Sequence, residues 1–472
     1  MIFSSITFLF YFLPVFFLLY YLAAPKYKNI VILLASIFFY SWGAPRFIFA
    51  ILGTTVVDFY IVRSMADAEQ PFRRKLLLSF SLALNLGLLF YFKYCNFFIE
   101  NIDAALLAAG AKPLTWEKVV LPIGISFYTF ESLTYVVDVY RRLHQPLRKF
   151  FDYQLYIILF PKLIAGPIIR YHDFSGQVYD HTSHETIDNK LKGLYRFFIG
   201  LGKKVLIANA MGHTADIIFK MPGNELGTVT AWYGAVAYTF QIYFDFSGYS
   251  DMAIGLGLMM GFRFPENFNN PYTAVSITDF WRRWHITLGT WMRNYLYIPL
   301  GGNKVSRPRL FFNLWLVFLL SGLWHGAAWG FIVWGAYHGA FLVAERLFLG
   351  KWLQKASRFA VLYTFPVVVI GWVFFRSAAL GDAVGYIGHM FSIQSSAGWQ
   401  PDREFYIIGM VAVLFSFFTI PAWGKAIQYK IFYADYPIKR HLLVAFITLV
   451  LFVLSAARIA GADFNPFIYF RF

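Results

Sequence analysis

The chain has 472 residues, of which 59% are hydrophobic, 21% aromatic and only 14% charged. A soluble domain of this composition would aggregate, and the alternating pattern of a membrane β-barrel is absent, so repeated apolar runs of about 20 residues indicate a helical membrane protein. The formal net charge of +16 does not indicate nucleic-acid binding, because Lys and Arg fall mostly in short connections between apolar runs.

The first half of the chain alternates apolar runs with short polar connections. The first run, residues 6–24, is interpreted as a retained span because no basic segment precedes it. Further helical spans or span pairs are predicted at residues 30–42, 47–62, 76–98 and 119–140. Because basic connections stay on the cytoplasmic side, residues 63–75 and 141–149 are predicted to be cytoplasmic and residues 100–118 external.

The segment 153–170 differs from a regular span. It contains Pro161, Lys162, Gly166 and Pro167 in an apolar background. Prolines at this spacing break a helix, and a lysine that faces lipid is costly. We therefore expect a re-entrant or broken segment that lines a cavity.

The polar stretch 171–190 holds three histidines, His172, His181 and His184. No cysteine or tight ligand spacing accompanies them, so we interpret the stretch as a solvated loop and not as a metal site. The single cysteine, Cys95, ends an apolar run and is interpreted as a packed thiol.

The second half of the chain contains the remaining predicted spans. They are residues 191–211, 229–246, 310–329, 331–344, 359–375, 405–420 and 442–459. With the basic connections placed inside, the chain has about 11–12 spans and both termini outside. We predict an all-α polytopic membrane protein, built as a single domain over residues 1–472, in which short or re-entrant helices complete the bundle.

Polar side chains gather in two blocks that are rich in aromatic residues, residues 278–302 and 321–330. The first block contains Arg282, Arg283, His285, Arg293 and Asn294. Polar groups are costly at membrane depth unless they face a cavity or a partner, so each is a candidate functional residue. The arginines suit the phosphates of a coenzyme A donor. An alternative stays open, in which the arginines are cytoplasmic anchors and the aromatic rings an interfacial belt.

His325 is the side chain that this alternative does not explain. It follows Trp324 in the apolar run 310–333, which contains no other ionisable side chain. A buried imidazole stays neutral and can accept a proton, which suits a general base that activates an attacking hydroxyl. His338 would point away from His325 on one continuous helix, so we interpret it as structural and expect no metal site.

Residues 241–251 end a predicted span with several hydroxyls and carboxylates. They are polar groups that exposure to lipid does not explain. We predict that they line a polar tunnel together with His285 and His325. Within this stretch, Tyr243 and Asp245 are candidate donor-binding or substrate-binding residues, as is Trp324 beside the second histidine.

Blocks along nearly the whole chain resemble the membrane-bound O-acyltransferase family, and within it the bacterial alginate O-acetylase branch. They are MIFSSITFLFYFLP, LPIGISFYTFESLTYVVDVYR, FPKLIAGPIIRY, KKVLIA, QIYFDFSGYSDMAIGLGLMMGFRFPENFNNPY, FWRRWHITLGTWMRNYLYIPLGGN, GLWHGAAWGF and FIYFRF. The branch usually has Arg-Asp-Tyr where this chain has Arg293-Asn294-Tyr295, which puts in doubt an ion pair at that position. Glu131, which is often Gln in relatives, is interpreted as a tolerant position.

The resemblance implies that His325 is the catalytic histidine of the family and that His285 is a second functional histidine. It implies an O-acyltransferase of the cytoplasmic (inner) membrane, with acetyl-CoA as donor substrate and no permanently bound cofactor. It further implies O-acetylation of an extracellular polysaccharide such as alginate, completed by an extracytoplasmic SGNH-type partner that receives the acyl group after it crosses the membrane.

Two kinds of alternative remain open. Within the same chemistry, the chain could serve peptidoglycan O-acetylation or D-alanyl transfer to teichoic acid. Outside it, a transporter or flippase would move an acyl carrier or glycan without acyl chemistry, and would keep doing so with His325 replaced. The absence of a fixed-period internal repeat counts against the inverted-repeat transporter folds.

Overall fold

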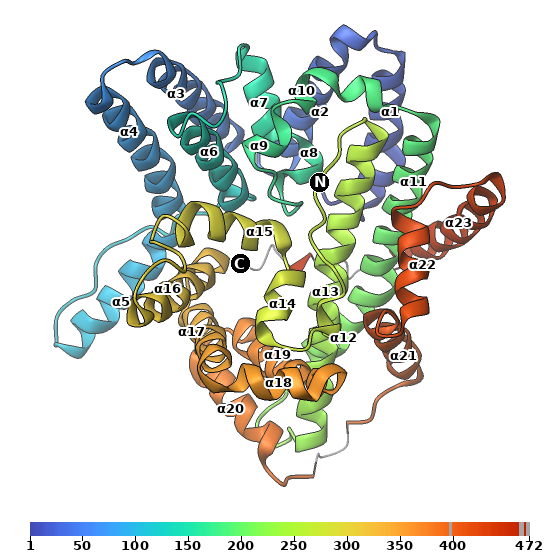
Figure 1. Cartoon of the computed structure of the whole chain (residues 1–472). Helices are drawn as coiled ribbons and strands as arrows, with labels where there is room; N and C mark the ends of the chain where they lie inside the picture. The colour runs from blue at the N-terminus through green and yellow to red at the C-terminus, as the bar shows by residue number, and fades with distance from the viewer. Residues whose placement is uncertain (396–398, 462–466, 469–472) are drawn as a thin grey trace. The chain divides into compact units, whose positions relative to one another are not determined.

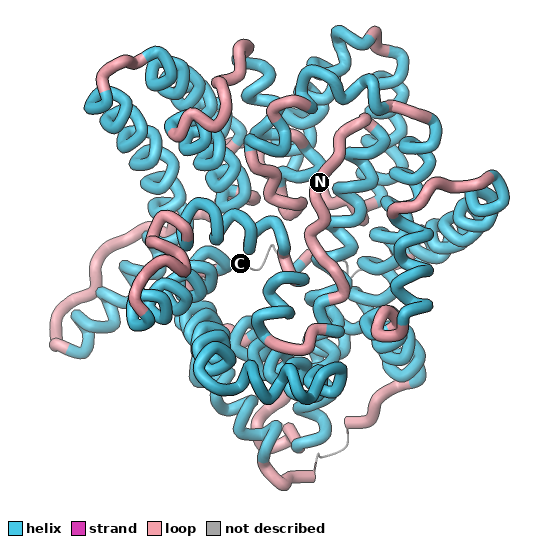
Figure 2. Tube along the Cα trace, in the orientation of Figure 1, coloured by secondary structure: helices cyan, strands magenta, loops and turns pink. Residues whose placement is uncertain are grey.

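The computed structural model describes residues 1–395, 399–461 and 467–468. All regular structure in these ranges is helical, with loops between the helices (Figure 2). The all-α prediction is therefore confirmed. The chain divides into two compact units, Met1–Thr186 with Met260–Phe264 and Ile187–Met259 with Pro265–Phe472. We call them unit 1 and unit 2. The single domain over residues 1–472 stays a prediction.

Unit 1 is built from helices that are mostly shorter than a full span (Figure 1). They are α1 (Leu13–Leu22), α2 (Lys28–Gly43), α3 (Ile48–Asp67), α4 (Pro71–Leu89), α5 (Cys95–Ala108), α6 (Ile125–Tyr140), α7 (Phe150–Ile158), α8 (Phe160–Leu163), α9 (Tyr171–Phe174) and α10 (Gln177–Asp180).

The proline-containing segment of unit 1 is broken, as its sequence predicts. Helix α7 ends at Ile158 and the single turn α8 begins at Phe160, next to Pro161. Lys162 is fully buried there and forms an ion pair with Glu131 of α6. A buried lysine needs such a partner, because an isolated charge in a low-dielectric interior is very costly. The structure therefore does not support the interpretation of Glu131 as a tolerant position.

One histidine of the stretch 171–190, His181, differs from the predicted solvated loop, whereas His172 is exposed as expected. His181 is only 2% exposed, and its ring stacks on Phe262 with the centroids 4.3 Å apart. Its Nε2 lies 2.7 Å from Asn29 Oδ1, and its Nδ1 lies 2.7 Å from the carbonyl oxygen of Met260. Burial lowers the pKa of His181, so the ring is a neutral structural group. Among the described residues no group of three or more His, Cys, Asp or Glu could hold a metal ion.

Unit 2 contains the longest helix and both polar blocks (Figure 1). Its helices are α11 (Ile187–Gly202), α12 (Asn209–Ile218), α13 (Thr228–Met259), α14 (Ile277–Arg283), α15 (Ile286–Trp291), α16 (Arg307–His325), α17 (Trp329–Ala344), α18 (Gly350–Ala356), α19 (Val361–Arg376), α20 (Leu380–Phe391), α21 (Arg403–Phe417), α22 (Ala422–Phe432) and α23 (Ile438–Ala460). The π-helical segment η5 (Lys203–Ala208) joins α11 to α12.

Glycines allow α11 and α13 to pack unusually closely. A Cβ added to Gly200 would lie 2.5 Å from the carbonyl oxygen of Gly248, so no larger side chain fits without a backbone shift. Small residues serve this purpose in membrane helix pairs generally. The close approach also places Arg196 of α11 against Asp251 of α13, with Arg196 Nη2 2.9 Å from the carboxylate.

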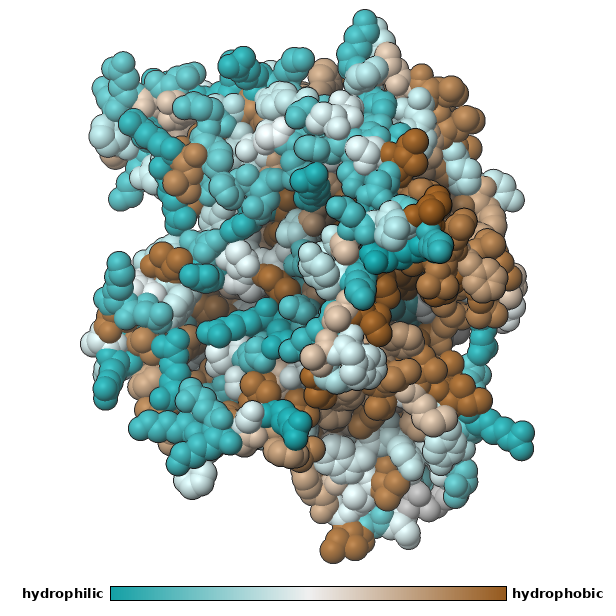
Figure 3. All heavy atoms as spheres, turned by 45° about the vertical axis from the view of Figure 1, so that its right-hand side comes forward, coloured by the Kyte–Doolittle hydropathy of each residue, from teal (hydrophilic) through white to brown (hydrophobic). Residues whose placement is uncertain are grey.

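Part of the surface suits contact with lipid. Apolar side chains, drawn brown in Figure 3, cover broad areas, and on α23 Leu442, Phe446 and Leu449 are each more than half exposed. In the described part of the chain, four helices are long and apolar enough to cross a membrane, or five if the bent pair α21 and α22 counts as one. Shorter helices complete the bundle, among them the apolar helix Thr7–Leu22, and α2 and α6 with 16 residues each.

Candidate active site

His325 is the last residue of α16, and the packing of α16 against α17 fixes its surroundings. A Cβ on Gly322 would lie 2.2 Å from the carbonyl oxygen of Phe331, so these two helices touch through backbone. His325 is only 5% exposed. The centroid of its ring lies 5.2 Å from the ring centroids of Trp334 and Phe375. The imidazole is therefore held among large aromatic side chains in a fixed orientation.

His285 occupies the junction between α14 and α15 in an unusual backbone conformation. Its φ is 46° and its ψ is 52°, a left-handed conformation that costs a non-glycine residue on the order of 1–3 kcal/mol. The residue is 1% exposed, and its ring lies edge-on to Phe246 of α13 with the centroids 4.7 Å apart. Backbone strain of this kind persists where the surroundings impose it, and it is frequent at functional sites.

The structure brings the two predicted histidines together, although they are far apart in the sequence. The ring centroids of His285 and His325 are 6.4 Å apart, and Trp324 lies 5.9 Å from His285. His285, Trp324 and His325 form what we call the histidine cluster. The polar tunnel that we expect around it stays a prediction.

Asn267 orients His285, and the sequence reasoning did not single it out. Asn267 Oδ1 accepts hydrogen bonds from the backbone N–H of Thr287 at 3.3 Å and from Thr287 Oγ1 at 2.9 Å. A backbone N–H can only donate, so the amide oxygen faces this side, and His285 Nδ1 at 3.1 Å must donate to it. The neutral ring therefore carries its proton on Nδ1 and its lone pair on Nε2.

The two histidines differ in how well they tolerate positive charge. His285 lies in a connection outside the candidate spans, and burial lowers its pKa to about 3. It also precedes the N-terminus of α15, where the helix dipole disfavours a cation. His325 ends a 19-residue helix, where the dipole favours a cation. Of the two, His325 is better placed to take up a proton during a reaction.

The candidate donor-binding residues of the first block are distributed differently. Arg282 and Arg293 are exposed, whereas Arg283 Nε lies 2.9 Å from Asp279 Oδ1, one turn earlier in α14. Asn294 is half-buried in the π-helical segment Met292–Tyr297 that continues α15. Arg282 and Arg293 therefore present their charges to solvent or to a ligand, and Arg283 is already engaged within its helix.

The two candidates from α13 have separate surroundings. Tyr243 is buried, and its ring lies 6.1 Å from that of Trp284, the neighbour of His285. Asp245 instead forms an ion pair with Lys204 at 2.8 Å and accepts a hydrogen bond from the backbone N–H of Ile468 at 2.8 Å. Tyr243 thus contacts the sequence neighbour of His285, whereas Asp245 makes an ion pair and a backbone hydrogen bond that are structural contacts.

His338 lies close to the histidine cluster without joining it. Trp334 contacts both rings, with centroid distances of 5.2 Å to His325 and 5.3 Å to His338. A fully buried His338 packed against Trp281 and Trp334 agrees with the structural interpretation of this residue.

Replacing Asn267 by Leu is expected to lower the rate of the reaction at this site by about 10–100-fold, the usual cost of losing a group that orients a functional imidazole. Asn267→Asp keeps an acceptor for the Nδ1 proton and should restore most activity. Because the new carboxylate stabilises the imidazolium, it raises the pKa of His285, so the acid limb of the pH–rate profile should move to higher pH. An unchanged profile in the Asp variant, with an unchanged rate in the Leu variant, would contradict the orienting role.

Comparisons with known proteins match the chain to one family and to relatives named as acyl-transferring enzymes. The model of MBOAT, the membrane-bound O-acyltransferase family, matches residues 4–378, a range that includes the histidine cluster. Over 495 aligned residues the chain is 41% identical to the probable alginate O-acetylase AlgI of Pseudomonas putida, with 100% of both chains covered. It is 36% identical to the peptidoglycan O-acetyltransferase of Helicobacter pylori, over 83% of this chain and 80% of that protein. It is 30% identical to the teichoic acid D-alanyltransferase of Bacillus subtilis, over 54% and 68% respectively.

Proposed function

Because the chain belongs to the membrane-bound O-acyltransferase family and is a multi-pass membrane O-acyltransferase, we propose that its donor substrate is acetyl-CoA. We further propose that the acetyl group serves the O-acetylation of an extracellular polysaccharide such as alginate. The observation that carries the catalytic assignment is the buried pair of His285 and His325, whose ring centroids are 6.4 Å apart. Support for the acceptor comes from relatives named alginate O-acetylase, of which one is 41% identical over the whole chain.

In the proposed reaction, His325 is the general base. Its imidazole removes the proton of the acceptor hydroxyl as the hydroxyl oxygen attacks the thioester carbonyl of the acetyl donor. When the tetrahedral intermediate collapses, the carbon–sulfur bond breaks and the proton passes from His325 to the departing coenzyme A thiolate. The helix C-terminus at His325 stabilises the imidazolium that exists between these steps. His285, held as the neutral Nδ1-protonated tautomer by Asn267, presents Nε2 as a hydrogen-bond acceptor toward the reacting groups.

We place the enzyme in the cytoplasmic membrane, where acetyl-CoA is available on the inner side. The acetyl ester formed on the acceptor hydroxyl is then presented on the outer side of the membrane. There a hydroxyl of an extracytoplasmic SGNH-type acyltransferase attacks the ester carbonyl, releases the acceptor hydroxyl and carries the acetyl group to the polymer. The described chain includes four helices that are long and apolar enough to cross a membrane, which supports a role in the passage of the acyl group across it.

The proposed activity can be tested in proteoliposomes that contain the purified protein and radiolabelled acetyl-CoA. We expect labelled acetyl esters to form when the SGNH-type partner and alginate are supplied, and less ester with peptidoglycan or teichoic acid as acceptor. Preferential labelling of peptidoglycan, or transfer of D-alanine, would replace alginate by the corresponding acceptor. Movement of an acyl carrier without ester formation would favour the flippase alternative.

Neutralising the exposed arginines is expected to weaken donor binding more than catalysis. Arg282→Gln and Arg293→Gln should each raise the KM for acetyl-CoA about three- to tenfold with little change in kcat, the pattern of lost uniform binding. Arg283→Gln should have a smaller effect because Asp279 already engages this guanidinium. Arg73→Gln is the matched control, since Arg73 is an exposed arginine of another connection predicted to be cytoplasmic. Unchanged donor kinetics with reduced membrane insertion would identify these arginines as anchors.

A further inference from the structure

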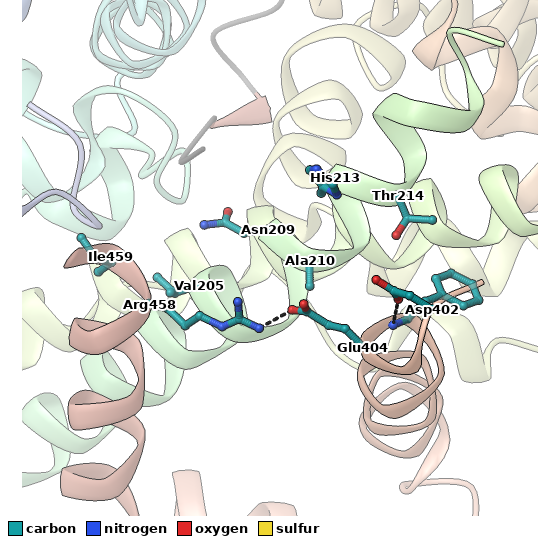
Figure 4. Close-up of a pocket in the computed structure, with 10 residues that line it drawn as sticks. Val205, Asn209, Ala210, His213, Thr214, Asp402, Glu404, Arg458 and Ile459 are labelled. Carbon is teal, nitrogen blue, oxygen red and sulfur yellow. Dashed lines mark hydrogen bonds and ion pairs between the residues drawn. The ribbon is translucent and has the colours of Figure 1, made fainter. Parts of the chain in front are cut away.

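Two adjoining cavities in unit 2 share Phe405 and have different chemistry. One, of about 240 Å³, is polar and is lined by groups that include His213, Asp402, Glu404 and Arg458 (Figure 4). The other, of about 480 Å³, is lined by apolar and aromatic side chains of α12, α13 and α21. Neither lining includes His285 or His325, so the acyl-transfer chemistry does not account for these cavities.

The polar cavity lies at the C-terminal end of α23, a candidate membrane span, and at the N-terminal end of α21, which forms a candidate span together with α22. Asp402 caps the N-terminus of α21, with its Oδ1 2.7 Å from the backbone nitrogen of Phe405. Arg458 lies in the last turn of α23, a candidate span, and forms an ion pair with Glu404 (Figure 4). The ends of spanning helices lie at the depth of lipid headgroups. The cavity therefore offers two carboxylates and one guanidinium at that depth.

The second, apolar cavity adjoins the polar cavity at Phe405 and runs along α21, and we call it the apolar groove. Its lining on this helix runs from Phe405 to Leu414, and the nine helical steps between these two residues span about 14 Å at 1.5 Å per residue. On the other wall are residues of α13, including Tyr233, whose ring is 5.6 Å from that of Phe405. A Cβ added to Gly409 in the middle of the groove would have no neighbour within 4 Å. The groove is thus open and apolar over a length that suits part of a lipid acyl chain.

We propose that this pair of cavities binds one phospholipid with an ethanolamine headgroup. Arg458 contacts the phosphate, Asp402 and Glu404 contact the ammonium group, and one acyl chain lies in the groove beside Gly409. The excess of carboxylates disfavours a phosphatidylglycerol headgroup, which carries the phosphate charge without the ammonium. The apolar continuation disfavours a polysaccharide, because a sugar chain would bury its hydroxyls against hydrocarbon.

The proposal is tested by native mass spectrometry of the purified full-length protein. The protein is equilibrated with mixed micelles that contain equal amounts of phosphatidylethanolamine and phosphatidylglycerol. We expect one tightly retained lipid, with the ethanolamine lipid favoured about fivefold, the effect of roughly one favourable charge contact at a membrane surface. Asp402→Asn with Glu404→Gln should remove this preference, while the introduced asparagine side chain can still cap α21.

A groove-filling variant separates a specific site from the general lipid coat. Gly409→Phe places a ring in the open groove and should abolish retention of the lipid. Gly87→Phe is the matched control, because a Cβ at this exposed glycine of α4 also meets no neighbour within 4 Å. Retention of the lipid by Gly409→Phe, or equal retention of both lipids by the unmodified protein, would overturn the proposal.

Discussion

Replacing His325 by Gln is expected to slow acyl transfer at least about a hundredfold, while the protein remains folded and still binds the acyl donor. Removal of a proton by a positioned base contributes typically about 10²–10⁴ in rate, and glutamine cannot supply this step. Gln is a better replacement than Ala because the imidazole fills space between Trp334 and Phe375. An alanine would leave a cavity among these rings, and cavities in packed cores are destabilising.

The same substitution at His285 should have a smaller effect. His285 is held as a neutral ring by burial, by Asn267 and by its place before a helix N-terminus, so its expected contribution is positioning and not proton uptake. We therefore expect the rate of His285→Gln to lie between those of the unmodified protein and His325→Gln.

Acyl transfer from labelled donor in proteoliposomes, measured together with donor binding, decides between these assignments. Near-normal transfer by His325→Gln would remove this residue from the mechanism and make His285 the candidate base. Donor binding by the variant shows that a loss of rate is not a loss of fold, and the melting profile of the purified protein gives an independent check.

The sequence predicts which residues make up the candidate active site better than it predicts the contacts between them. His325 was found because ionisable side chains are rare in apolar runs, and His285 because polar side chains gather in an aromatic-rich block. The structure places the two histidines next to each other. Asn267 was not found, because an asparagine in a polar connection carries no such signal. Its role depends on the fold, which brings the loop after α13 beside the left-handed residue at the start of α15.

In the broken segment of unit 1, too, the sequence predicts the local structure but not the contacts with distant residues. Prolines and glycines predict that the segment 153–170 is interrupted, and α7 and α8 confirm it. Glu131 lies in a separate apolar run, and nothing in the sequence pairs it with Lys162. For the same reason the buried state of His181 was not predicted, since its partners Asn29 and Met260 come from distant parts of the chain.

Breaking the Glu131–Lys162 ion pair is expected to cost about 3–5 kcal/mol of the free energy of unfolding, the usual effect of leaving one member of a buried pair alone. Both side chains are almost completely buried, with relative exposures of 1% and 0%. The pair also has further contacts. Glu131 Oε1 accepts a hydrogen bond from the backbone N–H of Ile169 at 3.3 Å, and the Lys162 ammonium lies 4.8 Å from the ring centroid of Tyr156. The ion pair therefore ties the broken segment to α6.

The expected loss of stability can be tested with a variant of Lys162, a variant of Glu131 and the double variant. Lys162→Met leaves an unpaired carboxylate and Glu131→Gln leaves an unpaired ammonium, so each should lower stability strongly. The double variant should recover most of the loss, because the introduced glutamine can still accept the hydrogen bond from Ile169 while no buried charge remains. Such a recovery gives a large coupling energy in the double-mutant cycle.

The exposed pair of Lys118 and Glu100 in the same unit provides the control for this cycle. Their side chains are 77% and 57% exposed, and ion pairs in water contribute little to stability. Lys118→Met and Glu100→Gln should therefore leave the unfolding transition in mixed micelles nearly unchanged. If Lys162→Met behaves like Lys118→Met, or if the double variant of Glu131 and Lys162 is less stable than either single variant, the ion pair does not hold the broken segment in place. Strong destabilisation by each single variant, with recovery in the double variant, would show that Glu131 is what allows the Lys162 charge to be buried between α6 and α8.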